Sequence, residues 1–146
     1  MKSILISACL IGRECKYCGG SNILGGDVLS ALREKYELIP VCPESDGGLP
    51  TPRDPSERIG DKVMSISGRD VTAEYQKGAE IALALAKGNA CETALMKEQS
   101  PSCGSGSIYD GTFSGRLIPG YGVAAELLRA NGIEVLGESR VNELTD

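Results

Sequence analysis

The stretch Cys91–Met96 (CETALM), followed by Lys97–Gly106 (KEQSPSCGSG), decides how the rest of the chain is arranged. The first six residues are mostly apolar and predict a buried strand, whereas the next ten have neither helical nor strand periodicity. Pro101 disfavours the α region for the residue before it, so we expect the backbone to leave the strand extended and then turn. This segment gathers a thiol, hydroxyls, a carboxylate and the ammonium of Lys97, which we expect to face solvent. By itself it would fit an ordinary Ser/Gly turn.

The chain around this stretch alternates short apolar runs with helical patterns. The other apolar runs predict buried strands over residues 3–8, 38–41 and 133–136. Helical spacing predicts helices over residues 27–36, 72–87 and from about 123 to a stop at Gly132. Such alternation predicts right-handed crossovers and a mostly parallel α/β sheet with helices on both faces. We expect a small hairpin within residues 58–70, a short helix or tail at the C-terminus, and loops over residues 12–26, 42–53 and 108–115.

Length and composition restrict the kind of protein. The 146 residues fit one domain, 1–146, and show no repeat or linker. A net charge of −5 argues against a nucleic-acid polymer as partner, because phosphate binding needs a basic surface. No run of eighteen apolar residues is present and the apolar start is short for a secretory signal, so we expect no membrane partner and a cytoplasmic location.

Six cysteines and the absence of histidine restrict the chemistry. Disulfides are rare in reducing compartments, so several free thiols there suggest a metal, a cluster or catalysis. Without histidine, Ser-His-Asp and Cys-His nucleophile systems are excluded. A bound metal then needs thiolates or carboxylates, and a general base must be Asp, Glu, Lys or Tyr.

Three of the cysteines fall just past the ends of predicted parallel strands, namely Cys9, Cys42 and Cys103. The carboxyl ends of such strands share one edge of the sheet, where ligands bind, so we expect these thiols to be neighbours. A three-thiolate site fits a [4Fe–4S] cluster with one open iron, or a zinc ion with an open fourth position. Either would act there as a Lewis acid.

Two polar residues are expected beside these thiols. Glu44 follows Cys42 by two residues, and Ser100 precedes Cys103 by three. A carboxylate there can orient or deprotonate water, and a hydroxyl can position a substrate.

The remaining cysteines have weaker signals. Cys15 and Cys18 form a C-x-x-C pair without the second pair that zinc would need, and it does not open a helix as in thioredoxin-type sites. They could be bystanders, a redox pair or alternative cluster ligands. Cys91 is expected to pack in the core.

Four motifs together resemble one family, the thiouracil desulfidase-like family of bacteria and archaea, once classed as a domain of unknown function. They are SACLIG at 7–12, CPE at 42–44 with GGLPTPR at 47–53, SPSCG at 100–104 and YDGTF at 109–113. The resemblance runs in order over nearly the whole chain. One departure is Cys15–Gly19 (CKYCG), where members more usually carry Arg-Tyr-Asp/Asn-Gly, so Cys18 stands in the acidic or amide position.

The resemblance implies a Rossmann-like fold with a [4Fe–4S] cluster held by residues matching Cys9, Cys42 and Cys103. It implies a non-redox reaction in which the open iron captures the sulfur of a thiolated uracil, water replaces it and hydrogen sulfide leaves. Residues matching Glu44 and Ser100 would be the catalytic pair. The partner is then a small thiolated base.

Two other functions remain open. A non-catalytic protein could use three thiolates to hold zinc or a cluster, or to carry sulfur, but such a site has no use for Glu44 and Ser100. A thiol–disulfide oxidoreductase built on Cys15 and Cys18 ranks third.

Overall fold

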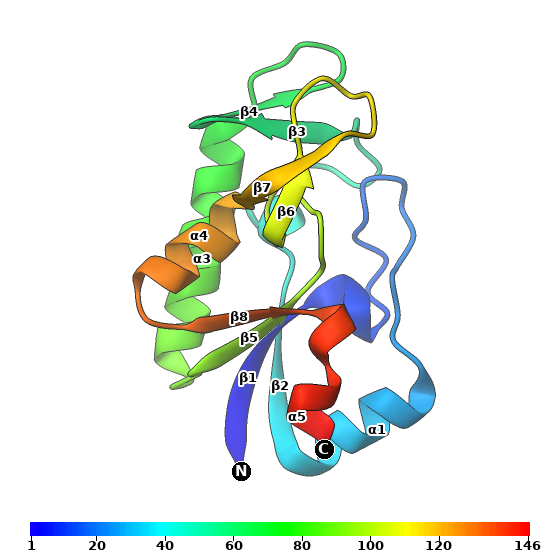
Figure 1. Ribbon diagram of the computed structural model, residues 1–146, viewed down its shortest axis with the longest axis vertical. Helices are drawn as coiled ribbons and strands as arrows, with labels where there is room; N and C mark the ends of the chain where they lie inside the picture. The colour runs from blue at the N-terminus through cyan, green and yellow to red at the C-terminus, as the bar shows by residue number, and fades with distance from the viewer.

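A four-stranded parallel sheet lies at the centre of the computed structural model, which describes residues 1–146 (Figure 1). Its strands run in the order β2-β1-β5-β8, with bounds Lys2–Ser7 (β1), Tyr36–Val41 (β2), Thr93–Met96 (β5) and Glu134–Gly137 (β8). These are the four strands that the apolar runs predict. β2 begins two residues early because all six of its residues pair with β1, whereas β5 begins after Cys91, at the first residue that pairs with β8.

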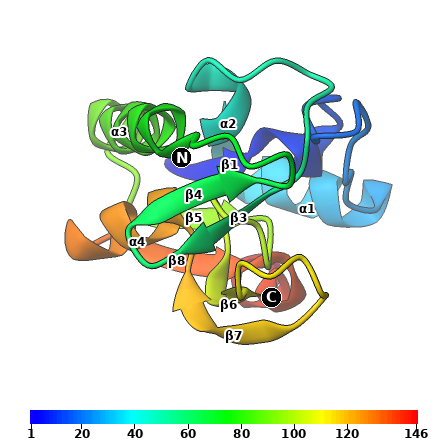
Figure 2. The ribbon, with the colours of Figure 1, turned by 90° about the horizontal axis from the view of Figure 1, so that it is seen from above.

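Helices cover both faces of this sheet, as predicted (Figures 1 and 2). Leu5, Ala94 and Met96 point to one face and share a core with α3 (Thr72–Gly88) and α4 (Val123–Ala130). Ile4, Ile6 and Leu95 point to the other face and share a core with α1 (Gly26–Lys35) and α5 (Asn142–Thr145). Alternate residues of a strand face opposite sides, so one short apolar run supplies both cores. No helix is both long and apolar enough to cross a bilayer.

Two antiparallel hairpins stand beyond the carboxyl edge of the sheet (Figure 1). The first, β3 (Ser56–Ile59) with β4 (Lys62–Ser65), lies where a small hairpin is predicted. The second, β6 (Ser105–Tyr109) with β7 (Leu117–Tyr121), was not predicted: the loop expected over residues 108–115 is confirmed from residue 110 on, but Ile108 and Tyr109 belong to a strand. Gly, Ser and Pro make these strands poor in intrinsic β propensity, so cross-strand pairing decides their state.

Short helical turns replace parts of the predicted loops. A 3₁₀ turn, η1 (Ala8–Ile11), follows β1, and a single turn, α2 (Pro43–Asp46), follows β2. Another 3₁₀ turn, η2 (Glu138–Arg140), follows β8. The strands β1, β2 and β5 therefore all end at the same edge, in η1, α2 and the turn at residues 97–104.

Candidate active site

The three cysteines predicted to be neighbours meet at one cavity at the carboxyl edge of the sheet, which Cys15 also lines. Cys9 lies in η1, Cys42 immediately before α2, and Cys103 in the turn after β5. All three are buried, and all three line a cavity of about 620 Å³. The structure thus brings together thiols from three segments that are remote in sequence, as expected from parallel strands that share one edge.

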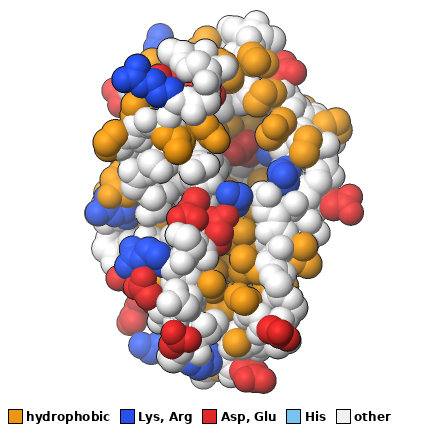
Figure 3. All heavy atoms as spheres, turned by 45° about the vertical axis from the view of Figure 1, so that its right-hand side comes forward, with side chains coloured by type: hydrophobic (Ala, Val, Ile, Leu, Met, Phe, Trp, Pro, Cys, Tyr) orange, Lys and Arg blue, Asp and Glu red, His pale blue; other side chains and the backbone are white.

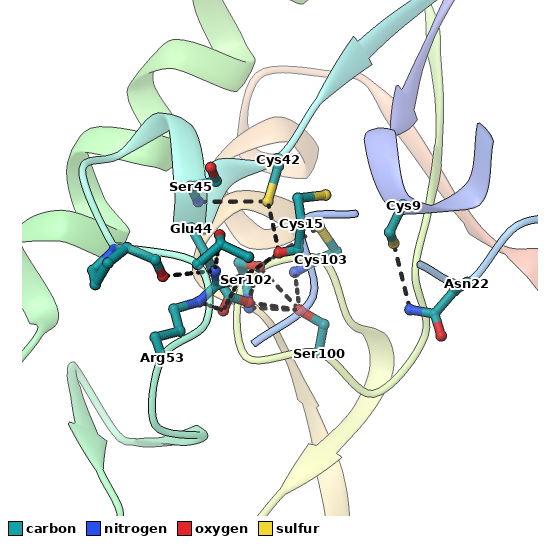
Figure 4. Close-up of polar contacts among 12 residues, drawn as sticks. Cys9, Cys15, Asn22, Cys42, Glu44, Ser45, Arg53, Ser100, Ser102 and Cys103 are labelled. Atoms are coloured by element: carbon teal, nitrogen blue, oxygen red, sulfur yellow. Dashed lines mark hydrogen bonds and ion pairs between the residues drawn. The ribbon is translucent and has the colours of Figure 1, made fainter. Parts of the chain in front are cut away.

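The polar surroundings of these thiols differ (Figure 4). The Ser45 N–H donates to Cys42 Sγ at 3.4 Å, and Asn22 Nδ2 donates to Cys9 Sγ at 3.5 Å. A hydrogen bond with the Cys15 side chain, aided by that of Ser45, lowers the pKa of Cys42. Burial raises the pKa of Cys9, although the Asn22 hydrogen bond opposes it.

Burial also raises the pKa of Cys103, to about 12. A buried thiolate is costly unless a cation stands beside it, so Cys9 and Cys103 favour the thiol form in the protein alone. A metal centre supplies the cation that such thiolates need, and its binding releases their protons. The donor set therefore fits a thiolate-bound metal group.

A single zinc ion fits this arrangement poorly. No group of three or more Cys, Asp or Glu side chains lies close enough together to hold one ion. A [4Fe–4S] cluster distributes its irons over a cube, so its cysteine ligands stand farther apart than those of a single tetrahedral zinc. Three sulfurs around a cavity suit the larger group better.

Close packing positions Glu44 above this cavity. Glu44 lies in α2, which rests on α3 where a Cβ at Gly78 would clash with the Pro43 carbonyl oxygen. Asp46 Oδ2 accepts the Cys42 N–H at 3.0 Å and closes the start of the turn. Helix α2 can therefore pack this closely against α3 only because residue 78 has no side chain.

Each oxygen of the Glu44 carboxylate has different partners (Figure 4). Oε1 accepts from Arg53 Nε at 3.2 Å and Arg53 Nη2 at 3.1 Å. The two side chains are only 14% (Glu44) and 7% (Arg53) exposed. Oε2 accepts from Ser102 Oγ at 2.8 Å and lies 3.4 Å from Ser100 Oγ. Burial, and after it the Glu44 charge, raise the pKa of Tyr75, so a neutral phenol stands beside this carboxylate.

Ser100 is held by the turn that carries Cys103. Its Oγ accepts the N–H of Ser102 at 3.1 Å and that of Cys103 at 3.0 Å. The turn is itself tied to the start of α4, where the N–H groups of Val123 and Ala124 donate to the carbonyls of Pro101 and Ser102. The structure thus brings Ser100 and Glu44, 56 residues apart in sequence, within hydrogen-bond distance.

Several residues of the cavity were not among those predicted from sequence. Arg53 and Ser102 lie inside quoted motifs, but only contacts across the fold reveal their roles. Rings from Tyr17, Tyr109 and Phe113 also line the cavity.

Phe113 has a positive φ of 57°, which is uncommon for a residue with a bulky side chain. Its N–H and that of Gly111 both donate to Glu57 Oε1, at 3.1 and 2.9 Å, so β3 fixes the turn that carries this ring.

The other cysteines and Lys97 occupy distinct places. Cys15 is buried and lines the cavity, whereas Cys18 is exposed and lies outside its lining. Cys91 is buried in the core beside α3 and α4, as predicted. Lys97 does not extend freely into solvent as expected, because its Nζ lies 2.9 Å from Glu138 Oε2 and its side chain lines the cavity.

The face around the hairpins carries apolar side chains (Figure 3). The exposed Ile59, Leu117 and Ile118 belong to the two hairpins, and Ile66 follows β4 directly. The cavity itself has both signs of charge in its lining, with three basic residues, Lys16, Arg53 and Lys97, against Glu44, Glu57 and Glu98.

Fold and site together define a class: an α/β protein that holds buried thiols, a carboxylate and a hydroxyl in one cavity at the carboxyl edge of a parallel sheet. The chain belongs to the 2-thiouracil desulfurase family, whose model matches residues 4–140. This agrees with the resemblance found in its motifs.

Two relatives extend over nearly all of the chain. The protein YbbK of Bacillus subtilis (strain 168), described as uncharacterized, is 43% identical over 151 residues, covering 97% of this chain and 99% of its own. The solved structure of TudS, a [4Fe-4S]-dependent thiouracil desulfidase, is similar with a TM-score of 0.94 and 46% identity, covering 99% of this chain and 95% of that one. The α/β fold predicted from the sequence is confirmed.

Proposed function

We propose that this protein is an iron–sulfur-dependent desulfidase that converts a thiolated nucleobase such as thiouracil to the oxo base and hydrogen sulfide. The reaction is non-redox, because water supplies the oxygen of the new C=O group and both of its protons leave with the sulfide. The observation that carries the proposal is that Glu44 and Ser100, with 3.4 Å between Oε2 and Oγ, line the same cavity as the buried thiols of Cys9, Cys42 and Cys103. Membership of the 2-thiouracil desulfurase family supports it.

The cofactor is a [4Fe–4S] cluster, and we assign Cys9, Cys42 and Cys103 as its ligands. Their burial in one cavity and their positions just past the ends of parallel strands support this assignment, whereas Cys15, which also lines the cavity, follows no strand. When bound, a cluster with three protein ligands supplies an iron that can act as a Lewis acid toward the sulfur of the base.

Glu44 is the proposed general base. Its Oε2 faces the hydroxyls of Ser100 and Ser102 at the cavity, where it can take a proton from the water that attacks the carbon bearing sulfur. The two N–H donors of Arg53 hold the opposite oxygen, which keeps the carboxylate in one orientation. Ser100, itself held by two backbone N–H groups, positions the water and the substrate.

The cavity suits a small flat molecule. A volume of about 620 Å³ is in the common range for small-molecule sites, ~300–1,000 Å³. The rings of Tyr17, Tyr109 and Phe113 offer π faces against which a heterocycle can stack. The net charge of −5 favours a free base over a nucleic-acid polymer. Residues 1–146 would act as one unit, and six free cysteines fit the reducing cytoplasm.

A non-catalytic cluster carrier is the competing function. It requires the three thiols but gives no reason for a buried carboxylate, clamped by Arg53, to face a cavity of this size. A buried ion pair is a poor source of stability, which argues that Glu44 and Arg53 serve another purpose here.

Anaerobic purification followed by a turnover assay tests the proposal. We expect brown protein with about four iron and four sulfide per chain, as for one [4Fe–4S] cluster. Added 2-thiouracil should yield uracil and sulfide in equal amounts, without an added reductant or oxidant. Stoichiometric zinc without iron would overturn the cluster assignment, and a loaded protein that releases no sulfide would favour the carrier.

A further inference from the structure

We propose that Ser102 is a proton-relay residue that connects Ser100 to Glu44. This inference rests on the proposed function and adds to it a residue that the catalytic pair does not include. Ser102 Oγ lies 2.8 Å from Glu44 Oε2 and 2.9 Å from Ser100 Oγ, so it stands between the two groups (Figure 4).

The direction of the hydrogen bonds follows from the inventory of donors. An ionised carboxylate can only accept, and the Ser102 hydroxyl has one proton, so the 2.8 Å contact to Glu44 takes that proton. In the 2.9 Å contact between the two serines Ser102 must then accept, and Ser100 donates. The chain therefore runs from Ser100 O–H to Ser102 O–H to Glu44 Oε2.

The middle of this chain is shielded from solvent. Ser102 is 1% exposed, and the only other polar neighbour of its hydroxyl is the sulfur of Cys103 at 3.6 Å. The direct path from Ser100 Oγ to Glu44 Oε2 is 3.4 Å, long for an O–H···O bond, whereas both links through Ser102 are below 3.0 Å. The relay is the better-connected path for a proton.

The backbone hydrogen bonds that hold Ser100 also support its part in the relay. Its oxygen accepts two backbone N–H groups, from Ser102 and Cys103. Fixed donors of this kind stabilise negative charge that develops on an oxygen, as in an oxyanion hole. Ser100 can thus pass its proton onward while the charge on its oxygen is held by the backbone.

The proton transfer balances as follows. The Ser102 proton moves to Glu44 Oε2 and the Ser100 proton moves to Ser102 Oγ, which leaves a negative Ser100 Oγ held by its two N–H donors with one lone pair free. That lone pair then takes a proton from a water in the cavity, and Ser100 is a hydroxyl again. Hydroxide remains to form the bond to carbon, and Glu44 becomes neutral. The same path in reverse returns the proton from Glu44 when the sulfide leaves, so each residue regains its starting state.

The Ser102 backbone is held independently of its hydroxyl. Its carbonyl accepts from the N–H groups of Ala124 at 2.9 Å and Ala125 at 3.1 Å, and its own N–H donates to Ser100. Ser102→Ala should therefore keep the turn and the place of Cys103. Ser105→Ala is the matched control, because it also removes a part-buried hydroxyl, one that donates to the Val135 carbonyl at 3.3 Å.

The test compares anaerobic holoenzymes of matched iron content with 2-thiouracil as substrate. We expect Ser102→Ala to lower kcat by roughly 10- to 100-fold, within the range of positioned acid–base catalysis, with KM changed less than about twofold. Ser105→Ala should keep the wild-type rate. In a Glu44→Gln background Ser102→Ala should cost nothing more, since residues that act as one unit are not additive.

Two measurements separate a relay from mere positioning. The rate of the wild-type enzyme in mixtures of H₂O and D₂O should follow a curve that requires more than one moving proton, and Ser102→Ala should reduce it to a straight line. The infrared band of the Glu44 carboxylate is the one that is lost in Glu44→Gln. This band should shift in Ser102→Ala and not in Ser105→Ala, which detects the hydrogen bond between Ser102 and Glu44 in the absence of substrate.

The outcomes are distinct. Three results would each overturn the relay alone. They are a wild-type kcat in Ser102→Ala, a linear dependence of the wild-type rate on the D₂O fraction, and a full additional loss of kcat when Ser102→Ala is added to Glu44→Gln. A wild-type holoenzyme that releases no sulfide overturns the proposed function and the relay with it.

Discussion

Arg53 holds one oxygen of Glu44 with two N–H groups, Nε at 3.2 Å and Nη2 at 3.1 Å, and leaves the other oxygen to hydroxyl groups at the cavity. Arg53 thus fixes Oε1 of the carboxylate, and Oε2 is the oxygen that can accept a proton. The same guanidinium also donates to the Cys15 carbonyl at 2.8 Å and to Thr51 Oγ1 at 2.9 Å. One buried arginine therefore ties the carboxylate to the two loops beside it.

Glu44→Gln should lower thiouracil turnover by at least roughly a hundredfold, because it keeps the size of the side chain and removes the base. Steady-state sulfide release checks this at matched iron content, since Glu44 lies close to Cys42. Ser100→Ala should lower the rate less than Glu44→Gln does, because it interrupts the relay but leaves the base itself in place. Undiminished release by a fully loaded Glu44→Gln protein would place the base elsewhere, with Asp46 or Asp110 as the next candidates.

Arg53→Gln should lower the free energy of unfolding by about 3–5 kcal/mol, because it leaves a buried carboxylate without its cation. Adding Glu44→Gln should restore part of this loss, since the uncompensated charge is then gone. Denaturant unfolding of the variants measures both effects. Arg13→Gln is the control: its 2.9 Å ion pair with Asp46 is 45% exposed on the arginine side and should cost at most about 1 kcal/mol.

Cys9→Ser, Cys42→Ser and Cys103→Ser should each lose the cluster, because each removes one of the three thiolates assigned as its ligands. Cys91→Ser and Cys18→Ser should keep it, since neither residue lines the cavity. Iron and sulfide analysis of anaerobically purified variants gives the answer. If Cys15→Ser or Cys18→Ser loses the cluster while Cys42→Ser keeps it, the ligand assignment is wrong.

In cluster-free protein, Cys42 should remain reactive toward iodoacetamide at a lower pH than Cys9. The hydrogen bond with Cys15 lowers the pKa of Cys42, whereas burial raises the pKa of Cys9. The thiolate is the nucleophile, so a lowered pKa keeps the reactive form present as the pH falls. Mass spectrometry of peptides alkylated over a pH series resolves the two sites, and Cys15→Ala should move the Cys42 profile to higher pH. Equal profiles for Cys9 and Cys42 would contradict this reading of their surroundings.

Phe113→Ala should raise KM for thiouracil by about 5- to 150-fold with little change in kcat, because stacking of a base on an aromatic ring contributes ~1–3 kcal/mol. The effect concerns binding of the ring rather than proton transfer. Leu117→Ala is a suitable control, since Leu117 is exposed on the same hairpin and does not line the cavity. A fall in kcat with unchanged KM would assign Phe113 another role.

The central sheet was predictable because its strands are locally encoded. Each of β1, β2, β5 and β8 is a short apolar run between turn or helix signals. Such runs are stable as strands of a sheet that is covered on both faces. The β6–β7 hairpin was not predictable. Gly106, Pro119 and Gly120 lack β propensity, and only their pairing across the hairpin makes them strands.

The sequence by itself determined which thiols would meet. Cys9, Cys42 and Cys103 each follow a parallel strand, and parallel strands in one sheet must end at one edge. It also placed Glu44 and Ser100 near them by simple proximity along the chain. These inferences need only strand order and spacing, which are local properties of the chain.

Only the tertiary structure decided how those groups act on one another. Arg53 binds one oxygen of Glu44, and Ser102 lies between Ser100 and the other oxygen. Both arrangements depend on the packing of α2 against Gly78 and on the contact between the turn after β5 and α4. Hydrogen bonds act over about 3 Å, and their direction depends on which donors face which acceptors. Residues more than fifty positions apart acquire such relations through packing alone.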